Sequence, residues 1–266
     1  VPEDIISDEI KYQAKSKLSS KIAEIEKQSK FKDISIAKAR RLIEEGYLRD
    51  INIPISMRSI VDEILKDISA IGATFAPMVM VKSKDSYFLD HAFNTTVLSI
   101  LLGKHYRFTK PELKSLAHGS YQHKMGKVVL NQISKGRSPG KVASLYKEHP
   151  TFGYLLLSNS GVTVTPMETQ VVNQHHELQD GSGFPIGLKG SNQPPVKLSS
   201  SDKGQIFRLA QICCVTNAFD NLVFNPLEKK QMPQDEAVKK IILESGTKYN
   251  QHIVQTLLKV VPRYPV

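Results

Sequence analysis

The stretch QVVNQHHELQDGSGFPIGLKG, residues 170–190, holds the densest local pattern in the chain. Two adjacent histidines, His175 and His176, precede four glycines and a proline that fall within ten residues. Imidazole is the commonest neutral metal ligand, and glycine lets a backbone turn sharply or approach another group closely. The stretch therefore predicts a metal site next to a tight loop.

The size and charge of the chain limit the classes of protein to consider. It has 266 residues, 40% of them apolar, which is enough for one large domain or a domain with a smaller companion. Its formal net charge of +10 favours anionic partners such as nucleotides, although a lysine-rich solvated surface gives the same composition. Because no run of basic residues alternates with aromatic residues, we do not predict nucleic-acid binding.

Two adjacent cysteines, Cys213 and Cys214, lie in an apolar run. Neighbouring cysteines rarely pair with each other, so we interpret them as small core residues in a reducing compartment. No apolar run reaches about 18 residues, and we predict no membrane span. The chain begins with Val1 rather than Met and shows no signal-peptide pattern, so we expect further sequence upstream.

Apolar residues recur at helical spacing through most of the chain. Thr109, with Pro111 and Glu112 after it, is typical of a helix start. Strand-like alternation is scarce, and we therefore predict an all-α fold. The predicted helices lie at 8–50 (two or three helices), 88–104, 109–123, 207–222 and 234–261.

The pattern also predicts a division of the chain. Asn52–Pro54 has the composition of a break, and Ser59 is a candidate N-cap for the helix that follows. We therefore predict an N-terminal helical region at 1–58 and a second domain at 59–266. Residues 191–206 are rich in Pro, Ser and Gly, which indicates an exposed loop.

Several common nucleotide and hydrolase motifs are absent. Gly136 and Gly140 are one residue too close for a P-loop, and Val142 stands where Ser or Thr is required. The glycines of Gly181–Gly187 are spaced wrongly for a dinucleotide loop. Ser182 does not lie in a G-x-S-x-G elbow, and no HExxH zinc motif occurs.

HHELQDGSGFPIGLKG, residues 175–190, resembles the signature of the HD-GYP family, which reads HHE-x-x-DG-x-GYP-x-GL-x-G. Four other segments resemble the remaining parts of the family pattern and follow in the family's order. They are YFLDH at 87–91, YQHKMGK at 121–127, EHP at 148–150 and FRLAQICCVTNAFD at 207–220. The resemblance extends over about residues 60–260 and leaves the first 58 residues outside it.

The resemblance implies an HD-domain helical bundle that hydrolyses the bacterial second messenger cyclic di-GMP, and we accordingly predict a bacterial cytoplasmic protein. The family uses two or three metal ions, usually iron or manganese. Lys127 lies in the segment that resembles the family's lysine-containing motif, and we expect this catalytic candidate to contact a phosphate. Five histidines fall on the family's metal-ligand positions: His91, His123, His149, His175 and His176.

Three positions depart from the family pattern. Lys124 replaces the aspartate of the HD pair, Asn217 replaces a second aspartate, and Phe184 replaces the tyrosine of GYP. Tyr87 also stands where some members have a glutamate. A bridging carboxylate offsets part of about +4 of charge in a dinuclear centre, which neither an amide nor an ammonium group does. We therefore predict either no metal or one divalent iron or manganese ion, and no dinuclear centre.

Lysine at position 124 has a second possible state. Desolvation lowers the pKa of a buried lysine, and a neutral amine has a free lone pair. No feature of the sequence forces this state on Lys124.

The loop DGSGFP keeps the glycines and an aromatic ring but loses the tyrosine hydroxyl. An exposed loop of this kind suits contact with a nucleotide or with a partner protein. The N-terminal helices are a second candidate surface for a protein partner. The residues assigned to the loop contact are Asp180, Gly181, Gly183, Phe184 and Pro185.

Three functions remain open from the sequence. The first is a degenerate HD-GYP-like domain that binds cyclic di-GMP, a related nucleotide or a protein without turnover. The second is an active metal-dependent phosphodiesterase that hydrolyses cyclic di-GMP. The third is a scaffold that binds only a partner protein. The replacement of two aspartates favours the first function.

Overall fold

The computed structural model describes most of the chain as helix. The described residues are 6–27, 29–32, 34–70, 87–136, 138, 142–143, 145–196, 204–224 and 232–261. These ranges contain no β-strand, which confirms the predicted all-α fold. The helices are α1 (Asp8–Glu26), α2 (Ile36–Glu44), α3 (Ile53–Ala70), α4 (Tyr87–His105), α5 (Lys110–Gln122), α6 (Gly126–Ser134), α8 (His149–Ser158), α9 (Pro166–Gln174), α10 (Arg208–Phe224), α11 (Gln234–Leu243) and α12 (Gln251–Val260).

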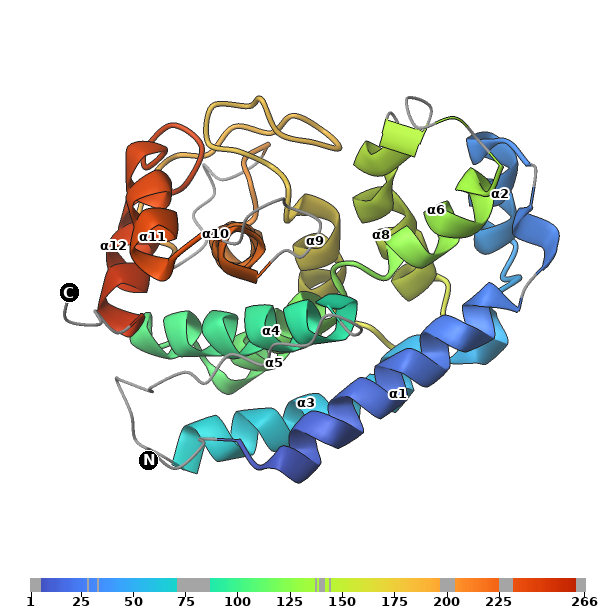
Figure 1. Cartoon of the computed structure of the whole chain (residues 1–266), viewed down its shortest axis with the longest axis horizontal. Coiled ribbons are helices and arrows are strands. Elements are labelled where there is room, and N and C mark those ends of the chain that lie inside the picture. The colour runs from blue at the N-terminus through green and yellow to red at the C-terminus, as the bar shows by residue number, and fades with distance from the viewer. Residues whose placement is uncertain are drawn as a thin grey trace.

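Helices α4, α5, α9 and α10 form the centre of the molecule (Figure 1). Helices α1 and α3 run together along one side, α11 and α12 lie at one end, and α6 and α8 lie with α2 at the other. None of the helices in the described part of the chain is both long and apolar enough to cross a membrane.

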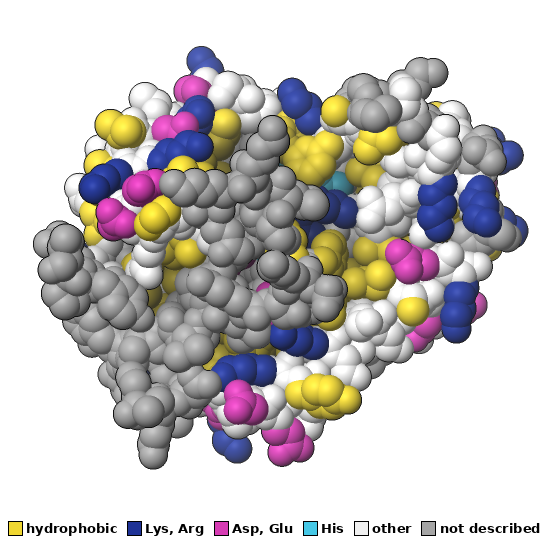
Figure 2. Space-filling view, viewed as in Figure 1, with side chains coloured by type: hydrophobic (Ala, Val, Ile, Leu, Met, Phe, Trp, Pro, Cys, Tyr) yellow, Lys and Arg dark blue, Asp and Glu magenta, His cyan; other side chains and the backbone are white. Residues whose placement is uncertain are grey.

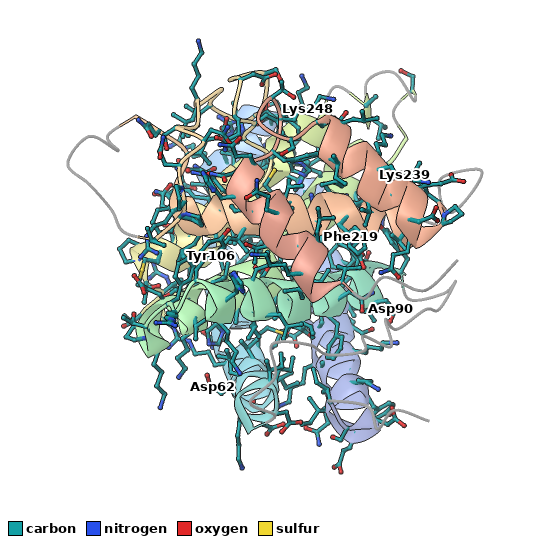
Figure 3. The ribbon with its side chains drawn as sticks, turned by 90° about the vertical axis from the view of Figure 1, so that its left-hand side faces the viewer. Asp62, Asp90, Tyr106, Phe219, Lys239 and Lys248 are labelled. Atoms are coloured by element: carbon teal, nitrogen blue, oxygen red, sulfur yellow. The ribbon has the colours of Figure 1, made fainter. Side chains whose placement is uncertain are left out.

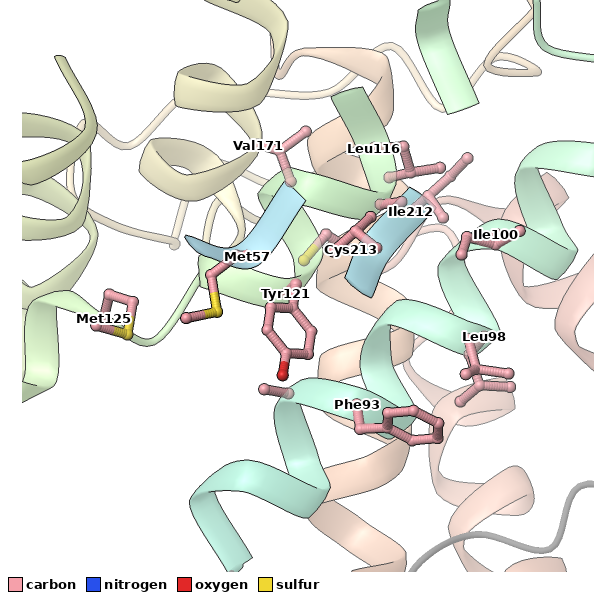
Figure 4. Packing of buried hydrophobic residues seen from close by; sticks show 14 of the residues in the cluster. Met57, Phe93, Leu98, Ile100, Leu116, Tyr121, Met125, Val171, Ile212 and Cys213 are labelled. Atoms are coloured by element: carbon pink, nitrogen blue, oxygen red, sulfur yellow. The ribbon is translucent and has the colours of Figure 1, made fainter. Parts of the chain in front are cut away.

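Buried hydrophobic residues form one core that extends from α1 to α12. Figure 4 shows Tyr121 of α5 among Met57 of α3, Phe93 of α4 and Cys213 of α10. Cys213 and Cys214 are buried and unpaired, in agreement with their interpretation as core residues. The Tyr121 hydroxyl donates to the backbone oxygen of Ala14 at 2.7 Å, so α1 is joined to the helix that ends at the site.

Local capping signals set the helix ends that matter for the site. The predicted start of α5 is confirmed, because the Thr109 N–H donates to Glu112 Oε2 at 2.8 Å in a capping box. Helix α9 begins after Thr165, whose side chain accepts from the Glu168 N–H. Because α5 and α9 both end just before a histidine, their C-terminal ends carry site residues.

The predicted helix start at Ser59 is wrong. Helix α3 begins at Ile53, directly after Asn52, whose backbone is left-handed with φ of 50°. A proline near the first turn does not interrupt this helix, because the first-turn N–H groups have no partner inside a helix. Ser59 lies within α3, and its hydroxyl accepts from Lys17 Nζ at 3.0 Å. The division of the chain at residue 58 stays a prediction.

Helices α6 and α8 approach each other closely at two glycines. A Cβ atom added at Gly126 would lie 2.0 Å from the backbone oxygen of His149 and 2.6 Å from the nitrogen of Gly153. Only glycine fits there. This contact brings the end of α5 and the start of α8, with His123 and His149, next to each other.

Two ion pairs link the N-terminal helices to the rest of the molecule. Lys15 of α1 pairs with Asp90, near the start of α4, and Arg40 of α2 pairs with Glu148, just before α8. Figure 3 shows Asp90 on the part of α4 that lies next to α1. Asp90 and Glu148 each directly precede a histidine of the candidate site.

Candidate functional site

The structure brings the five predicted histidines together, and it divides them into two groups. We call His91, His123 and Asn217 the inner cluster, and His149, His175 and His176 the outer cluster. The rings of His123 and His175, with centroids 4.8 Å apart, join the two clusters. His105, His118 and His252, which the family pattern does not use, are not among the ring contacts of either cluster.

Three ligand atoms meet in the inner cluster. His91 Nε2 lies 3.1 Å from both His123 Nε2 and Asn217 Oδ1, and His123 Nε2 lies 3.3 Å from Asn217 Oδ1. The Asn221 amide donates to the backbone oxygen of Asn217 at 2.7 Å and to Asn217 Oδ1 at 3.0 Å. These donations fix the oxygen of Asn217, rather than its nitrogen, toward the two imidazoles.

A buried carboxyl group lies next to the inner cluster. Asp220 Oδ2 lies 2.5 Å from His91 Nδ1, and both residues are buried. Burial raises the pKa of Asp220 well above its ordinary value and lowers the pKa of His91 well below its own. Both shifts favour the uncharged form of each group. With Nδ1 in contact with the carboxyl group, Nε2 is the ring nitrogen of His91 that faces His123 Nε2 and Asn217 Oδ1.

In the outer cluster, backbone carbonyls take the place of the carboxyl group. His149 Nδ1 and His175 Nδ1 donate to the backbone oxygens of Tyr146 and Val172, each at 2.7 Å. A carbonyl only accepts, so both Nε2 atoms carry lone pairs in the neutral rings. These two atoms face each other at 3.0 Å. Burial lowers the pKa of both histidines well below the ordinary value, which disfavours a proton between them.

Two facing lone pairs indicate a place for a cation. The ligand atoms of His149, His175 and His176 all lie within 4.8 Å of one another. A metal bound at roughly 2.0–2.1 Å from each imidazole nitrogen separates two such nitrogens by roughly 3 Å. The carbonyls on Nδ1 supply the orientation that metal-binding histidines ordinarily receive from a neighbouring acceptor. The outer cluster therefore fits one divalent transition metal.

Lys124 lies beside the outer cluster and is only 3% exposed. Its Nζ is 3.3 Å from Nε2 of His176. Burial, followed by the charge of Lys127, holds the pKa of Lys124 well below its usual range. The neutral amine has a lone pair, whereas the ammonium form repels a cation. Neither form supplies negative charge.

The donors fit one metal ion better than two. Within the described residues, the group of His, Cys, Asp and Glu side chains close enough to hold a metal contains three histidines and no carboxylate. Asp220 lies behind His91 and does not bridge the clusters. Two divalent ions would bring about +4 of charge into a buried space lined by neutral donors and one lysine, which is strongly unfavourable.

Aromatic and basic side chains surround the outer cluster. The Phe184 ring stacks on His176 with centroids 4.5 Å apart and an interplanar angle of 17°. Lys127 Nζ lies over the Tyr146 ring, 4.6 Å from its centroid. Burial lowers the pKa of Lys127 to about 8. Figure 2 shows histidine surface at the bottom of a hollow that hydrophobic and basic side chains border.

Glu177 fixes the loop that carries Phe184. Its buried carboxylate accepts from the backbone N–H groups of Ile186 at 2.7 Å, Gly187 at 3.0 Å and Leu188 at 2.8 Å. A Cβ atom at Gly183 would lie 2.4 Å from a backbone nitrogen, so the close packing of this loop requires glycine. The loop is therefore held against the histidine pair.

Asp180 faces away from this arrangement. Its exposed carboxylate accepts from the backbone N–H and the hydroxyl of Ser182, at 2.9 and 2.7 Å. These hydrogen bonds lower the pKa of Asp180 and shape the turn. Asp180 and the left-handed Gly181 define the loop conformation.

Sequence reasoning assigned no role to several residues that shape the site. Asp220 stands three positions after Asn217 on α10, and Tyr146 stands three positions before His149. This spacing on a helix places both pairs on shared faces and was the signal available. Glu177 was part of the quoted signature, but its hydrogen bonds to residues nine to eleven positions later are not readable from a pattern.

The chain matches a known protein family over most of its length. The family model described as HD domain matches residues 76–253, which is more than half of the chain. The chain belongs to the HD domain family. Its signature at 175–190 and its relatives place it in the HD-GYP branch of that family.

Curated relatives of this HD-GYP protein carry a shared description. A cyclic di-GMP phosphodiesterase of Thermotoga maritima is 31% identical over 116 residues, which are 44% of this chain and 28% of that protein. The cyclic di-GMP phosphodiesterase PA4108 of Pseudomonas aeruginosa is 24% identical over 211 residues, 78% of this chain and 47% of that protein. The chain thus spans less than half the length of either relative.

A solved structure has the same fold. Bd1817, a HDG"Y"P protein from Bdellovibrio bacteriovorus, is similar with a TM-score of 0.58 and 22% sequence identity. The similarity covers 82% of this chain and 66% of that chain. The HD-GYP fold is therefore established for this protein by both sequence and structure.

Proposed function

We propose that this protein is a degenerate HD-GYP domain that binds cyclic di-GMP without hydrolysing it. The observation that carries the proposal is Lys124, which is buried beside His176 of the outer cluster and supplies no negative charge there. Asn217 adds a neutral oxygen and no charge. The printed names of the relatives support cyclic di-GMP as the nucleotide.

The proposal includes one divalent iron or manganese ion held by His149, His175 and His176. Such an ion would act as a Lewis acid on a phosphate oxygen. The amine of Lys127 lies over the Tyr146 ring, which contacts His149 of the outer cluster, and it would contact the same phosphodiester. Without a second ion and a bridging carboxylate, the site lacks the two-metal clamp that stabilises both the attacking and the leaving oxygen of an in-line displacement at phosphorus. A role of the loop or of the N-terminal helices in binding a partner protein stays a prediction.

Three measurements on the purified chain test this proposal together. Elemental analysis should find close to one transition-metal ion per chain. Calorimetric titration with cyclic di-GMP should give saturable binding. Incubation of cyclic di-GMP with the chain and added Mn²⁺ or Fe²⁺ should give no linear or mononucleotide product.

The outcomes separate the three functions that the sequence left open. Two tightly held metals and hydrolysis would establish the active phosphodiesterase and overturn the proposal. Absence of both binding heat and hydrolysis would overturn it in favour of a scaffold.

A further inference from the structure

We propose that Tyr146 and Phe184 form a stacking surface for a purine base of the bound nucleotide, next to the phosphate contact of Lys127. This inference rests on the proposed function and specifies how the nucleotide is held. The proposed function uses the backbone oxygen of Tyr146 to orient His149 but gives no role to its side chain.

The two rings meet at a corner beside the outer cluster. Their centroids are 6.1 Å apart and their planes are inclined by 67°. Phe184 is held from behind by His176, and Glu177 fixes the backbone that follows it. Tyr146 leaves 40% of its surface exposed, although it lies against His149 with centroids 4.8 Å apart. A large aromatic side chain is therefore presented to solvent at a fixed place.

Positive charge accompanies both rings. Lys127 Nζ lies 4.6 Å from the Tyr146 centroid, and Lys147 Nζ lies 5.9 Å from that of Phe184. The acidic residue next to Lys147 in the chain, Glu148, is already paired with Arg40. Apolar peptides would not require this charge. Neither lysine forms an ion pair within the described residues, and flat rings next to such lysines match a ligand that has both an aromatic base and a phosphate.

The side chain of Tyr146 can be separated from its structural role. The group that orients His149 is the backbone oxygen of Tyr146, which any residue supplies. Tyr146→Phe keeps the ring, whereas Tyr146→Leu keeps apolar volume and removes the ring. Tyr12, which is 73% exposed on α1, offers a matched control for the loss of a surface tyrosine.

Fluorescence of a cyclic dinucleotide that carries 2-aminopurine gives a direct readout of stacking. The chain contains no tryptophan, so 2-aminopurine can be excited without emission from the protein. We expect quenching on binding to the wild-type chain. Base stacking on an aromatic side chain contributes enough that Tyr146→Leu should weaken cyclic di-GMP binding roughly tenfold or more. Tyr146→Phe, which keeps the ring, should retain most of the affinity that Tyr146→Leu loses, and Tyr12→Leu should bind as wild type.

Each outcome has a distinct meaning. Unchanged affinity in Tyr146→Leu, or binding to the wild type without quenching, would overturn the stacking surface and leave the proposed function intact. Equal loss in Tyr146→Phe and Tyr146→Leu would assign the effect to the hydroxyl and also overturn it. No binding of cyclic di-GMP to the wild type would overturn the inference together with the proposed function. If Tyr146→Leu fails to fold, Phe184→Leu and wild-type quenching provide the same test.

Discussion

The inner and outer clusters contain similar residues but differ in how they satisfy their buried polar atoms. In the inner cluster, the carboxyl group of Asp220 meets Nδ1 of His91, whose Nε2 faces His123 and Asn217. In the outer cluster, backbone carbonyls fix two lone pairs toward each other, and within the described residues the group of possible ligands contains no carboxylate. Imidazole thus meets a carboxyl group in one cluster and backbone carbonyls in the other, and the second arrangement suits a cation. The group that contacts Nδ1 of each histidine therefore distinguishes the two clusters.

Restoring negative charge should abolish this difference, with the largest effect of the changes considered. Lys124→Asp combined with Asn217→Asp places one carboxylate next to His176 and one next to His91 and His123, and together they offset the charge of a second ion. We expect the double variant to bind two metal ions per chain and to gain measurable cyclic di-GMP hydrolysis. Elemental analysis and product chromatography measure both properties.

The single variants are the controls for the double variant. Asn217→Asp alone leaves Lys124 in place, and we expect it to stay inactive. A double variant that folds, as judged by its circular dichroism, but still holds no more than one ion would contradict our assignment of these two positions.

Removal of one histidine from each cluster should affect metal binding unequally. His175→Ala removes a ligand of the outer cluster, and we expect metal affinity to fall by more than the roughly 10–100-fold typical of groups that only orient ligands. His123→Ala, the matched change in the inner cluster, should leave the bound metal in place. Competition with a chelator measures both affinities. Equal losses in the two variants would show that the ion is shared between the clusters.

The pH dependence of stability should report on the buried histidines in the metal-free chain. Burial lowers the folded-state pKa of all five, so their unfolded forms bind more protons below about pH 6.5. The free energy of unfolding therefore falls as the pH drops from 7 to 5. Each histidine contributes at most about 1.4 kcal/mol per pH unit.

Asp220 should oppose this trend, which distinguishes the inner cluster. Because the pKa of Asp220 is raised in the folded state, the folded chain binds a proton that the unfolded chain has released. The contribution of Asp220 to the free energy of unfolding is therefore lost as the pH rises from the pKa of unfolded aspartate through the folded-state pKa. Asp220→Asn removes the opposing contribution. Denaturant unfolding between pH 5 and pH 6.5 should then show a steeper rise of stability with pH than in the wild type. A shallower rise would mean that Asp220 is ionised in the folded chain.

The smallest expected effects come from the two N-terminal ion pairs. Lys15→Met leaves the carboxylate of the buried Asp90 with fewer partners and should cost about 1–3 kcal/mol of stability. Arg40→Met breaks a pair whose two side chains are 39% and 32% exposed, and should cost about 0–1 kcal/mol. Chemical denaturation compares the two. A larger effect of Arg40→Met would reverse this order and place the main anchor on α2.

Much of the fold could be predicted because its signals are local. Thr109 and Glu112 stand three residues apart, and their capping box depends on little else. Ser59 shows the opposite case, since a good capping residue lies inside a helix that tertiary packing and an earlier break had already started. The convergence of five histidines was predicted from motif order, which reflects the whole fold of the family.

The division of the histidines into two clusters could not be predicted. It depends on the carbonyls of Tyr146 and Val172 and on the carboxyl of Asp220, and no residue pattern shows which atom a ring nitrogen meets. Lys124 was expected to oppose metal binding through its charge. Its contact with His176, and the burial that lowers its pKa, exist only in the folded chain.

The ion pairs of the N-terminal helices give the site a mechanical connection to the beginning of the chain. Lys15 joins α1 to Asp90, whose neighbour His91 belongs to the inner cluster, and Arg40 joins α2 to Glu148, whose neighbour His149 belongs to the outer one. A shift of α1 relative to α2 therefore acts on the spacing between the clusters. Movement of the N-terminal helices would reach the candidate site as a change in the distance between its two histidine clusters.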